Sequence, residues 1–75
     1  MTINEYKQIW LARYQIIWGD EKGKELYRQR MAKHHMAIEE IMKRHNIETV
    51  EEYFQRENPE FLAERTRLMR DKYHG

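Results

Sequence analysis

The sequence predicts an all-α fold, a compact antiparallel bundle of three to four helices, and three observations support this prediction. Apolar residues recur at spacings of three and four along most of the chain, as on one face of an α-helix. No segment alternates apolar and polar residues over the length of a strand, and β-branched residues are sparse. Capping residues divide the chain into segments of helical length. We therefore expect a single helical domain over residues 1–75.

The first predicted helix covers residues 3–18. Thr2 and Glu5 form the pattern of a capping box, and Gly19 is expected to end the helix because glycine readily adopts positive φ angles. Four large aromatic residues follow at intervals of four, and aliphatic residues fill the gaps between them. The aromatic residues are Tyr6, Trp10, Tyr14 and Trp18, and the aliphatic residues are Ile3, Ile9, Leu11, Ile16 and Ile17. Together they cover well over half of the helix circumference, whereas an ordinary surface helix has an apolar stripe of roughly 100°.

The second predicted helix, residues 21–45, is the longest. Asp20 is positioned to cap it, and Asn46 is positioned to end it in the left-handed conformation. Gly23 weakens the first turn, which allows the start to slip to Lys24. An apolar seam with alternating spacings of four and three runs along this helix, as in left-handed helix packing. The seam consists of Tyr27, Met31, His34, Ile38, Ile41 and His45.

The last two predicted helices are shorter and cover residues 50–56 and 59–72. Thr49 begins a second capping-box pattern. Asn58 followed by Pro59 marks the start of the last helix, because asparagine caps helices and proline fits the first helical turn. The inward residues are expected to be Val50, Tyr53 and Phe54 in the shorter helix, and Phe61, Leu62, Arg65, Leu68, Met69 and Tyr73 in the longer one.

The helices 21–45 and 59–72 are expected to cover most of the apolar surface of helix 3–18, because each offers one apolar seam. The remainder should be an exposed strip along one margin of the first helix. Leu11 and Trp18 lie at one margin, and Ile9 and Ile16 lie at the other. Whichever margin is bare is the place where we expect a partner to bind.

The composition narrows the class of function. The net charge of +1 argues against a chain dominated by binding to nucleic acid or acidic membranes. Neither serine nor cysteine is present to act as a nucleophile, and no glycine-rich phosphate loop occurs. No apolar run has the length of a membrane span, and no signal peptide is evident. We therefore expect a cytoplasmic, non-enzymatic protein that uses no cofactor and no catalytic or structural metal, and that does not bind membranes.

Two neighbouring histidines, His34 and His35, are candidate functional residues. His34 lies on the apolar seam, where a buried histidine would make stability or assembly depend on pH near 6. His35 and Glu39 are four residues apart and could contribute two metal ligands from one helix. Two ligands do not make a metal site, so a surface pair between His35 and Glu39 is the favoured interpretation.

These observations predict a small protein–protein interaction module, namely a regulator, adaptor or inhibitor of a larger intracellular protein. Tryptophan and tyrosine carry much of the binding energy at protein interfaces, and both are concentrated in helix 3–18. A homodimer is one form that such binding could take, since a second copy would stabilise a small domain. The compact, cysteine-free chain is typical of bacterial or phage proteins. The predicted protein-binding residues are Trp10, Leu11, Tyr14, Trp18, Ile9 and Ile16.

The alternative is a regulator that binds DNA or RNA. The predicted helices 50–56 and 59–72 would then form a helix-turn-helix-like unit with three arginines facing the nucleic acid. These arginines are Arg65, Arg67 and Arg70. Glu60 and Glu64 oppose this alternative, because they place negative charge in the helix turns that should meet phosphates.

Overall fold

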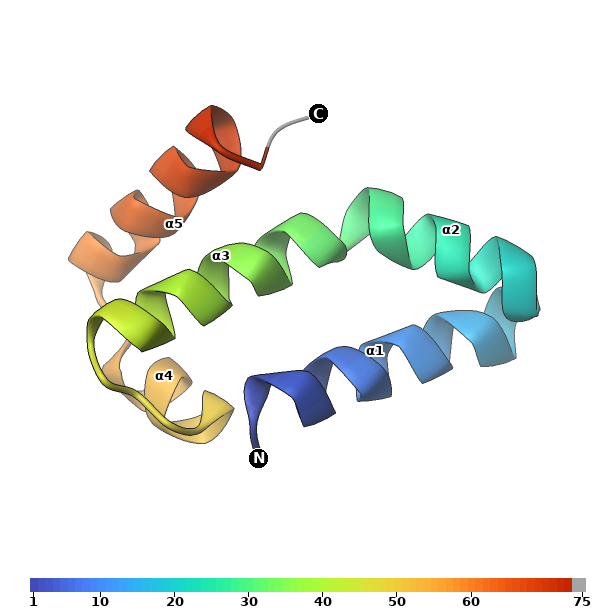
Figure 1. Ribbon diagram of the computed structural model, residues 1–75, viewed down its shortest axis with the longest axis horizontal. Helices are drawn as coiled ribbons and strands as arrows, with labels where there is room; N and C mark the ends of the chain where they lie inside the picture. The colour runs from blue at the N-terminus through green and yellow to red at the C-terminus, as the bar shows by residue number, and fades with distance from the viewer. Residues whose placement is uncertain (74–75) are drawn as a thin grey trace.

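The computed structural model describes residues 1–73, which form five α-helices and no strand. The helices are α1 (Ile3–Trp18), α2 (Asp20–Arg30), α3 (Ala32–Arg44), α4 (Val50–Arg56) and α5 (Pro59–Asp71). α1 and α2 form an antiparallel hairpin, and α3 extends the path of α2 back along α1 (Figure 1). The prediction of an all-α fold is confirmed. The bounds of α1 and α4 agree with the predicted ranges, and α5 ends one residue earlier than expected.

The single helix predicted over residues 21–45 is wrong, because the helix is interrupted at Met31. The backbone there stays in the right-handed helical region, but its φ of −118° with ψ −28° is far from the value in a regular α-helix. Hydrogen bonding nevertheless continues across the break, from Met31 N–H to the Tyr27 carbonyl and from His35 N–H to the Met31 carbonyl. The interruption lets α2 pack against α1 while α3 packs against both α1 and α5. Neither proline nor glycine occupies this position, so the usual signals of a helix break are missing.

The turn between α1 and α2 also differs from expectation. Gly19 serves as the N-cap of α2, with φ 94° and ψ 163°, and no side chain caps this helix. Asp20 is instead the first residue of α2. Gly23 does not delay the start of the helix, because it is the point where the two helix backbones meet. A Cβ atom added to Gly23 would lie 2.5 Å from both the Gln15 Cα atom and the Tyr14 carbonyl oxygen.

Side-chain caps at two other helix starts were predicted from the sequence. The Thr2 hydroxyl accepts a hydrogen bond from the Glu5 amide, and the Glu5 carboxylate accepts one from the Thr2 amide, which completes the first capping box. Thr49 likewise accepts a hydrogen bond from the Glu52 amide at 3.1 Å. The Glu52 carboxylate, however, pairs with Arg56 at 3.4 Å. The second capping box is therefore only half formed.

Two asparagines act at helix ends as predicted. The Asn58 side chain accepts a hydrogen bond from the Phe61 amide at 2.9 Å, and Pro59 occupies the first turn of α5. Asn46 follows α3 with φ 54°, in the left-handed region that asparagine tolerates better than most residues.

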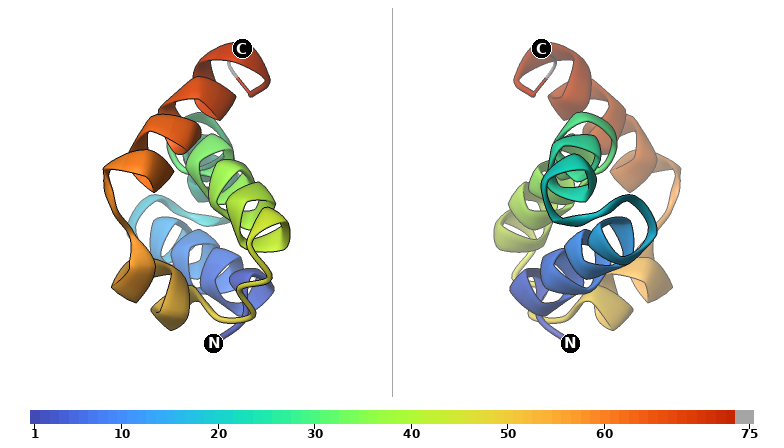
Figure 2. Two further views of the ribbon diagram at one scale, coloured as in Figure 1. Left: turned by 90° about the vertical axis from the view of Figure 1, so that its left-hand side faces the viewer. Right: turned by 90° about the vertical axis from the view of Figure 1, so that its right-hand side faces the viewer.

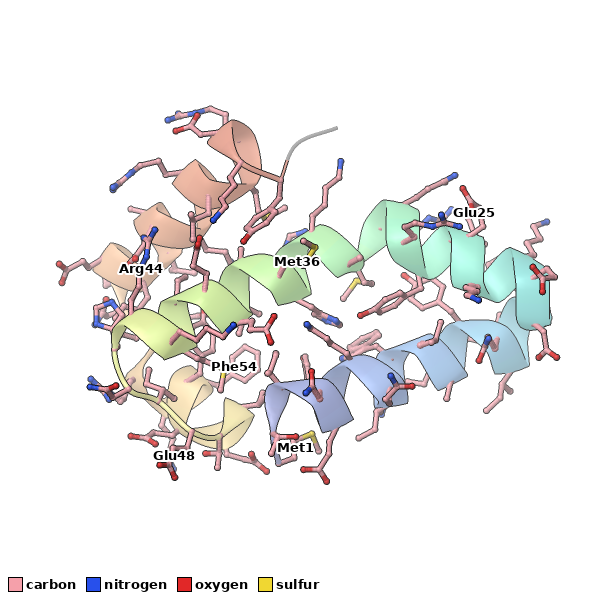
Figure 3. The ribbon with its side chains drawn as sticks, viewed as in Figure 1. Met1, Glu25, Met36, Arg44, Glu48 and Phe54 are labelled. Atoms are coloured by element: carbon pink, nitrogen blue, oxygen red, sulfur yellow. The ribbon has the colours of Figure 1, made fainter. Side chains whose placement is uncertain are left out.

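The main core lies between α3, α4 and α5. Its buried apolar side chains are Ala37, Ile38, Ile41, Met42, Ile47, Val50, Tyr53, Phe61 and Leu68. Ile3 and Tyr6 of α1 pack against the edge of this core. At its rim, Arg44 of α3, which is labelled in Figure 3, pairs with Glu64 of α5 at 2.8 Å. The apolar seam of α3 is thus covered within the chain and is not available to a second copy.

α1 contains no buried residue, although it is the most apolar helix of the chain. α5, which was expected to cover part of it, lies on the opposite side of α3 (Figures 1 and 2). Consequently the second half of α1 has α2 as its main neighbour. Ile16, Ile17 and Trp18 are 83%, 70% and 43% exposed. The margin with Ile9 and Ile16 is therefore exposed at both residues, whereas the margin with Leu11 and Trp18 is exposed at Trp18 and half-buried at Leu11.

Candidate functional site

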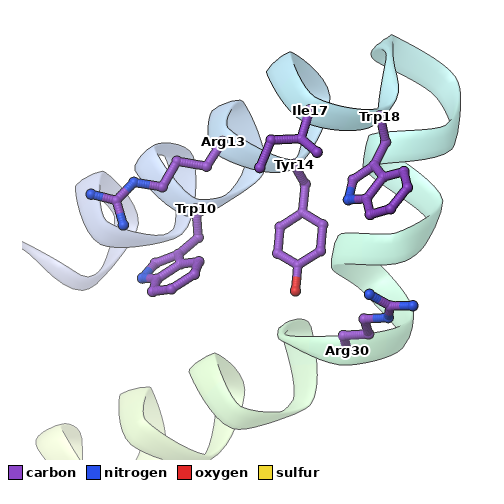
Figure 4. Close-up of a pocket in the computed structure, with 6 residues that line it drawn as sticks. All are labelled: Trp10, Arg13, Tyr14, Ile17, Trp18 and Arg30. Carbon is purple, nitrogen blue, oxygen red and sulfur yellow. The ribbon is translucent and has the colours of Figure 1, made fainter.

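A groove of about 260 Å³ opens along the α1–α2 hairpin, between the second half of α1 and the end of α2 (Figure 4). We call it the aromatic groove. It is lined by Trp10, Arg13, Tyr14, Ile17, Trp18 and Arg30. Both tryptophans of the chain therefore belong to this site.

The close approach of the two helices explains why the groove forms. At Gly23 the backbones of α1 and α2 leave no room even for a Cβ atom. Large side chains of α1 cannot lie between the helices at this level. Tyr14 and Trp18 instead project along the same flank of the hairpin, where they form one wall of the groove (Figure 4). Gly23, which has a low helix propensity, thus permits the close helix contact beside which the aromatic groove forms.

Cationic side chains stack on both tryptophans. The Arg13 guanidinium lies 5.2 Å from the centre of the Trp10 ring, and the Lys22 ammonium lies 5.5 Å from the centre of the Trp18 ring. Such contacts are attractive because the face of an aromatic ring is electron-rich. Tyr14 lies between the two tryptophans with its hydroxyl directed away from α1 (Figure 4). The groove therefore combines apolar walls with a positively charged rim.

A buried histidine lies next to the groove. His35 is 1% exposed and is surrounded by aromatic rings whose centres lie between 5.0 and 6.3 Å from its own. These rings belong to Tyr6, Trp10 and Tyr27. The Nδ1 atom of His35 shares a hydrogen bond of 2.9 Å with the Tyr27 hydroxyl. Its Nε2 atom is buried and makes no hydrogen bond with the described part of the chain.

The environment keeps His35 neutral. Burial lowers the pKa of His35 to about 4, and the nearby positive charges of His34 and Lys7 contribute to the shift. Burial also raises the pKa of its hydrogen-bond partner, Tyr27. At neutral pH this pair is therefore an uncharged, hydrogen-bonded link between α2 and α3 that spans the interruption at Met31.

The structure buries His35 rather than His34, the histidine that was considered as a pH-sensitive residue. His34 is half-buried, and its pKa is lowered by burial and by the charge of Arg65. The surface pair expected between His35 and Glu39 is not formed, because Glu39 pairs with Lys7 at 2.9 Å. Within residues 1–73, no group of three histidine or carboxylate side chains is arranged to hold a metal ion.

The six predicted binding residues fall into two sets. Trp10, Tyr14 and Trp18 line the aromatic groove. Ile9 and Ile16 are exposed on α1 outside the lining of the groove, and Leu11 is half-buried outside it. The prediction thus placed the aromatic residues in one site, but it treated the whole margin of α1 as equivalent.

Three lining residues were not predicted. Arg13 and Ile17 lie three and seven residues after Trp10, so helical periodicity places all three on neighbouring parts of one face. That spacing was a usable signal. Arg30 had no such signal, because its position depends on where the interruption at Met31 ends α2.

The arginines of the alternative nucleic-acid interface are mostly paired within the chain. Arg65 binds Glu57 at 3.3 Å, and Arg70 binds Asp71 at 2.9 Å. Arg67 is exposed. These ion pairs reduce the positive charge that α5 can present to phosphates.

Membrane insertion and homology offer no further guide to the site. None of the helices in residues 1–73 is both long enough and apolar enough to cross a bilayer. Comparison with known proteins finds no matching family model, no matching curated protein and no matching solved structure. The geometry of the site is therefore the basis for the function proposed below.

Proposed function

We propose that this chain is a non-enzymatic protein–protein interaction module whose binding surface is the aromatic groove together with the exposed end of α1. It acts by occupying the surface of a larger protein, as a regulator, adaptor or inhibitor in the cytoplasm. The observation that carries the proposal is the exposure of Ile16, Ile17 and Trp18 next to a groove that contains both tryptophans.

The composition of this surface supports the proposal. Single exposed apolar residues are ordinary, but contiguous apolar patches on small proteins commonly mark binding sites. Trp10, Tyr14 and Trp18 belong to the residue types that contribute most energy to protein interfaces. Trp10 packs against Tyr6 and His35, and Tyr14 packs against Tyr27, so these two rings have little side-chain freedom left to lose on binding.

The size of the groove supports a protein partner over a small-molecule substrate. Ligand pockets usually have volumes of about 300–1,000 Å³ and enclose most of the ligand. The aromatic groove has about 260 Å³ and is open to solvent. It suits about one side chain from a partner surface.

The test compares Ile17→Asp with Leu62→Asp. Both residues are exposed apolar positions on helices, but Ile17 lines the groove, and Leu62 lies on α5, where it is exposed and does not face inward as predicted. We expect a specific protein to be captured from the source cell by the native chain and by Leu62→Asp, and to be lost with Ile17→Asp. The captured protein is then purified, and its binding to the three chains is measured by calorimetry.

Circular dichroism provides the folding control for both variants. If both variants have the helicity of the native chain and similar melting temperatures, the loss of binding is due to the changed surface and not to unfolding. Equal binding of the purified partner to the native chain and to Ile17→Asp would overturn the proposed site.

A second copy of the chain is the competing occupant of this surface. Ile9, Ala12 and Ile16 are exposed at spacings of three and four, which is the repeat of a two-helix seam. Sedimentation equilibrium distinguishes the two cases. A dimer that dissociates in Ile16→Asp would support self-association, and a monomer at all accessible concentrations would leave a different protein as the partner.

A further inference from the structure

Two arginines flank the aromatic groove without a carboxylate partner. Arg13 lies at the Trp10 end, and Arg30 lies at the Trp18 end (Figure 4). Neither forms an ion pair within residues 1–73. Five other arginines of the chain each pair with a carboxylate in this range: Arg28, Arg44, Arg56, Arg65 and Arg70. Arg67 of α5 is the remaining unpaired arginine of the described chain.

The position of this charge affects what the groove can bind. Cations at the rim of a cleft with apolar walls produce a stronger local potential than the same cations on an open surface. Arginine also presents several N–H donors in a plane, and it binds carboxylates through two parallel hydrogen bonds. The hydroxyl of Tyr14 lies between the arginines and has no hydrogen-bond partner in the described chain.

We propose that the groove binds a partner segment in which one apolar side chain is flanked on both sides by aspartate or glutamate residues. The apolar side chain would pack against Tyr14 within the groove, and the flanking carboxylates would meet Arg13 and Arg30. This inference rests on the proposed function and specifies the partner chemistry of the same site. The charge of the rim selects the acidic residues, and the volume of the groove limits the apolar anchor to about one side chain.

A short synthetic peptide tests the chemistry directly. The probe is acetyl-Glu-Glu-Phe-Glu-Glu-amide, and the matched control replaces every glutamate with glutamine. Both tryptophans line the groove, so their indole N–H signals in ¹H–¹⁵N NMR spectra report binding at this site. We expect the acidic peptide to shift both signals and to bind at least about tenfold more tightly than the glutamine peptide.

Charge reversal identifies the residues responsible. Arg13→Glu and Arg30→Glu should each weaken binding of the acidic peptide by about tenfold or more. Arg67→Glu is the matched control, because it makes the same change at an unpaired arginine on α5, and it should change the affinity by less than about twofold. A peptide with lysine in place of every glutamate should regain affinity for the double variant Arg13→Glu/Arg30→Glu, in which both rim charges are reversed.

Several outcomes would overturn the inference. Equal binding of the glutamine peptide would show that charge makes no contribution, and equal weakening by Arg67→Glu would show a general charge effect. Tighter binding of a single-stranded oligonucleotide to the same two indoles would assign the groove to nucleic acid. If no acidic peptide binds while a protein partner remains sensitive to Ile17→Asp, the partner chemistry is wrong but the proposed function stands.

Discussion

At the scale of single residues, Gly23 decides how closely α1 and α2 approach. Its position in the first turns of α2 would ordinarily favour alanine, which stabilises an exposed helical site by about 0.8–1 kcal/mol over glycine. Here the added Cβ would lie 2.5 Å from backbone atoms of α1, and backbone atoms cannot turn aside as a flexible side chain can. Gly23→Ala should therefore destabilise the protein by about 1–3 kcal/mol, as measured by urea unfolding.

The sign of the change in the free energy of unfolding shows which effect is larger, the better helix propensity of alanine or the clash of its Cβ atom with α1. Lys24→Ala changes an exposed neighbour on the same helix and should alter the free energy of unfolding by less than about 0.5 kcal/mol. A stabilising Gly23→Ala would mean that the two helices do not touch at this point. In that case the explanation given for the groove would also fail.

His35 makes stability depend on pH. In the unfolded chain its pKa is near 6.5, and in the folded chain burial lowers the pKa to about 4. The unfolded state therefore binds the proton more readily, so the contribution of His35 is fully present above pH 6.5 and is lost as the pH falls to about 4. The loss between pH 7 and pH 5 should be about 2 kcal/mol.

The comparison that isolates His35 is the pH dependence of unfolding in His35→Phe. This variant keeps an aromatic ring among Tyr6, Trp10 and Tyr27 but has no proton to bind. Its stability should fall by about 2 kcal/mol less than that of the native chain between pH 7 and pH 5. His34→Asn serves as a second control, because the pKa of His34 is lowered as well. Identical pH dependence in the native chain and His35→Phe would contradict the burial of a neutral histidine.

At the scale of helices, α1 and α3 use their apolar residues differently. Ile41 of α3 is completely buried, whereas Ile16 of α1 is almost fully exposed. Ile41→Ala should cost about 2–5 kcal/mol of stability, and Ile16→Ser should change stability by less than about 0.5 kcal/mol. Urea unfolding monitored by circular dichroism measures both. A large cost for Ile16→Ser that grows with protein concentration would show that a second copy covers this residue.

Most helix ends could be predicted because their causes are local. The capping interactions of Thr2, Thr49 and Asn58, and the left-handed conformation of Asn46, depend on residues within one turn of the helix end. The interruption at Met31 could not be predicted in this way. Its cause is tertiary, since α2 and α3 follow different neighbours, and no residue at the break disfavours a helix.

The same distinction applies to the groove. Its tryptophans were predicted because i, i+4 spacing places large aromatic residues on one face of a helix. Arg30 was not predicted, because it is the last residue of α2 and its place beside the groove depends on the interruption at Met31. The exposure of Ile17 could not be predicted either, because it depends on how the helices pack. α5 lies beyond α3 and not beside α1, so it does not cover Ile17.

At the scale of the whole molecule, the buried core and the exposed apolar side chains lie at opposite ends of the structure. The buried core joins α3, α4, α5 and the first turns of α1, whereas the far end of the α1–α2 hairpin has few buried side chains. The His35–Tyr27 hydrogen bond lies between these two regions. A site at the exposed end can be altered by mutation or occupied by a partner without disturbing the core.

This division predicts a gradient in amide hydrogen exchange. Segments with few buried contacts open locally, whereas core segments exchange only through larger unfolding. Amides of residues 38–42 in α3 should therefore be protected at least about tenfold more than those of residues 15–18 in α1, a difference of about 1.4 kcal/mol in opening free energy. Exchange followed by NMR at two protein concentrations provides the measurement. Uniform protection at both concentrations would show that the hairpin end unfolds together with the core, and protection of residues 15–18 that rises with concentration would instead indicate a second copy bound there.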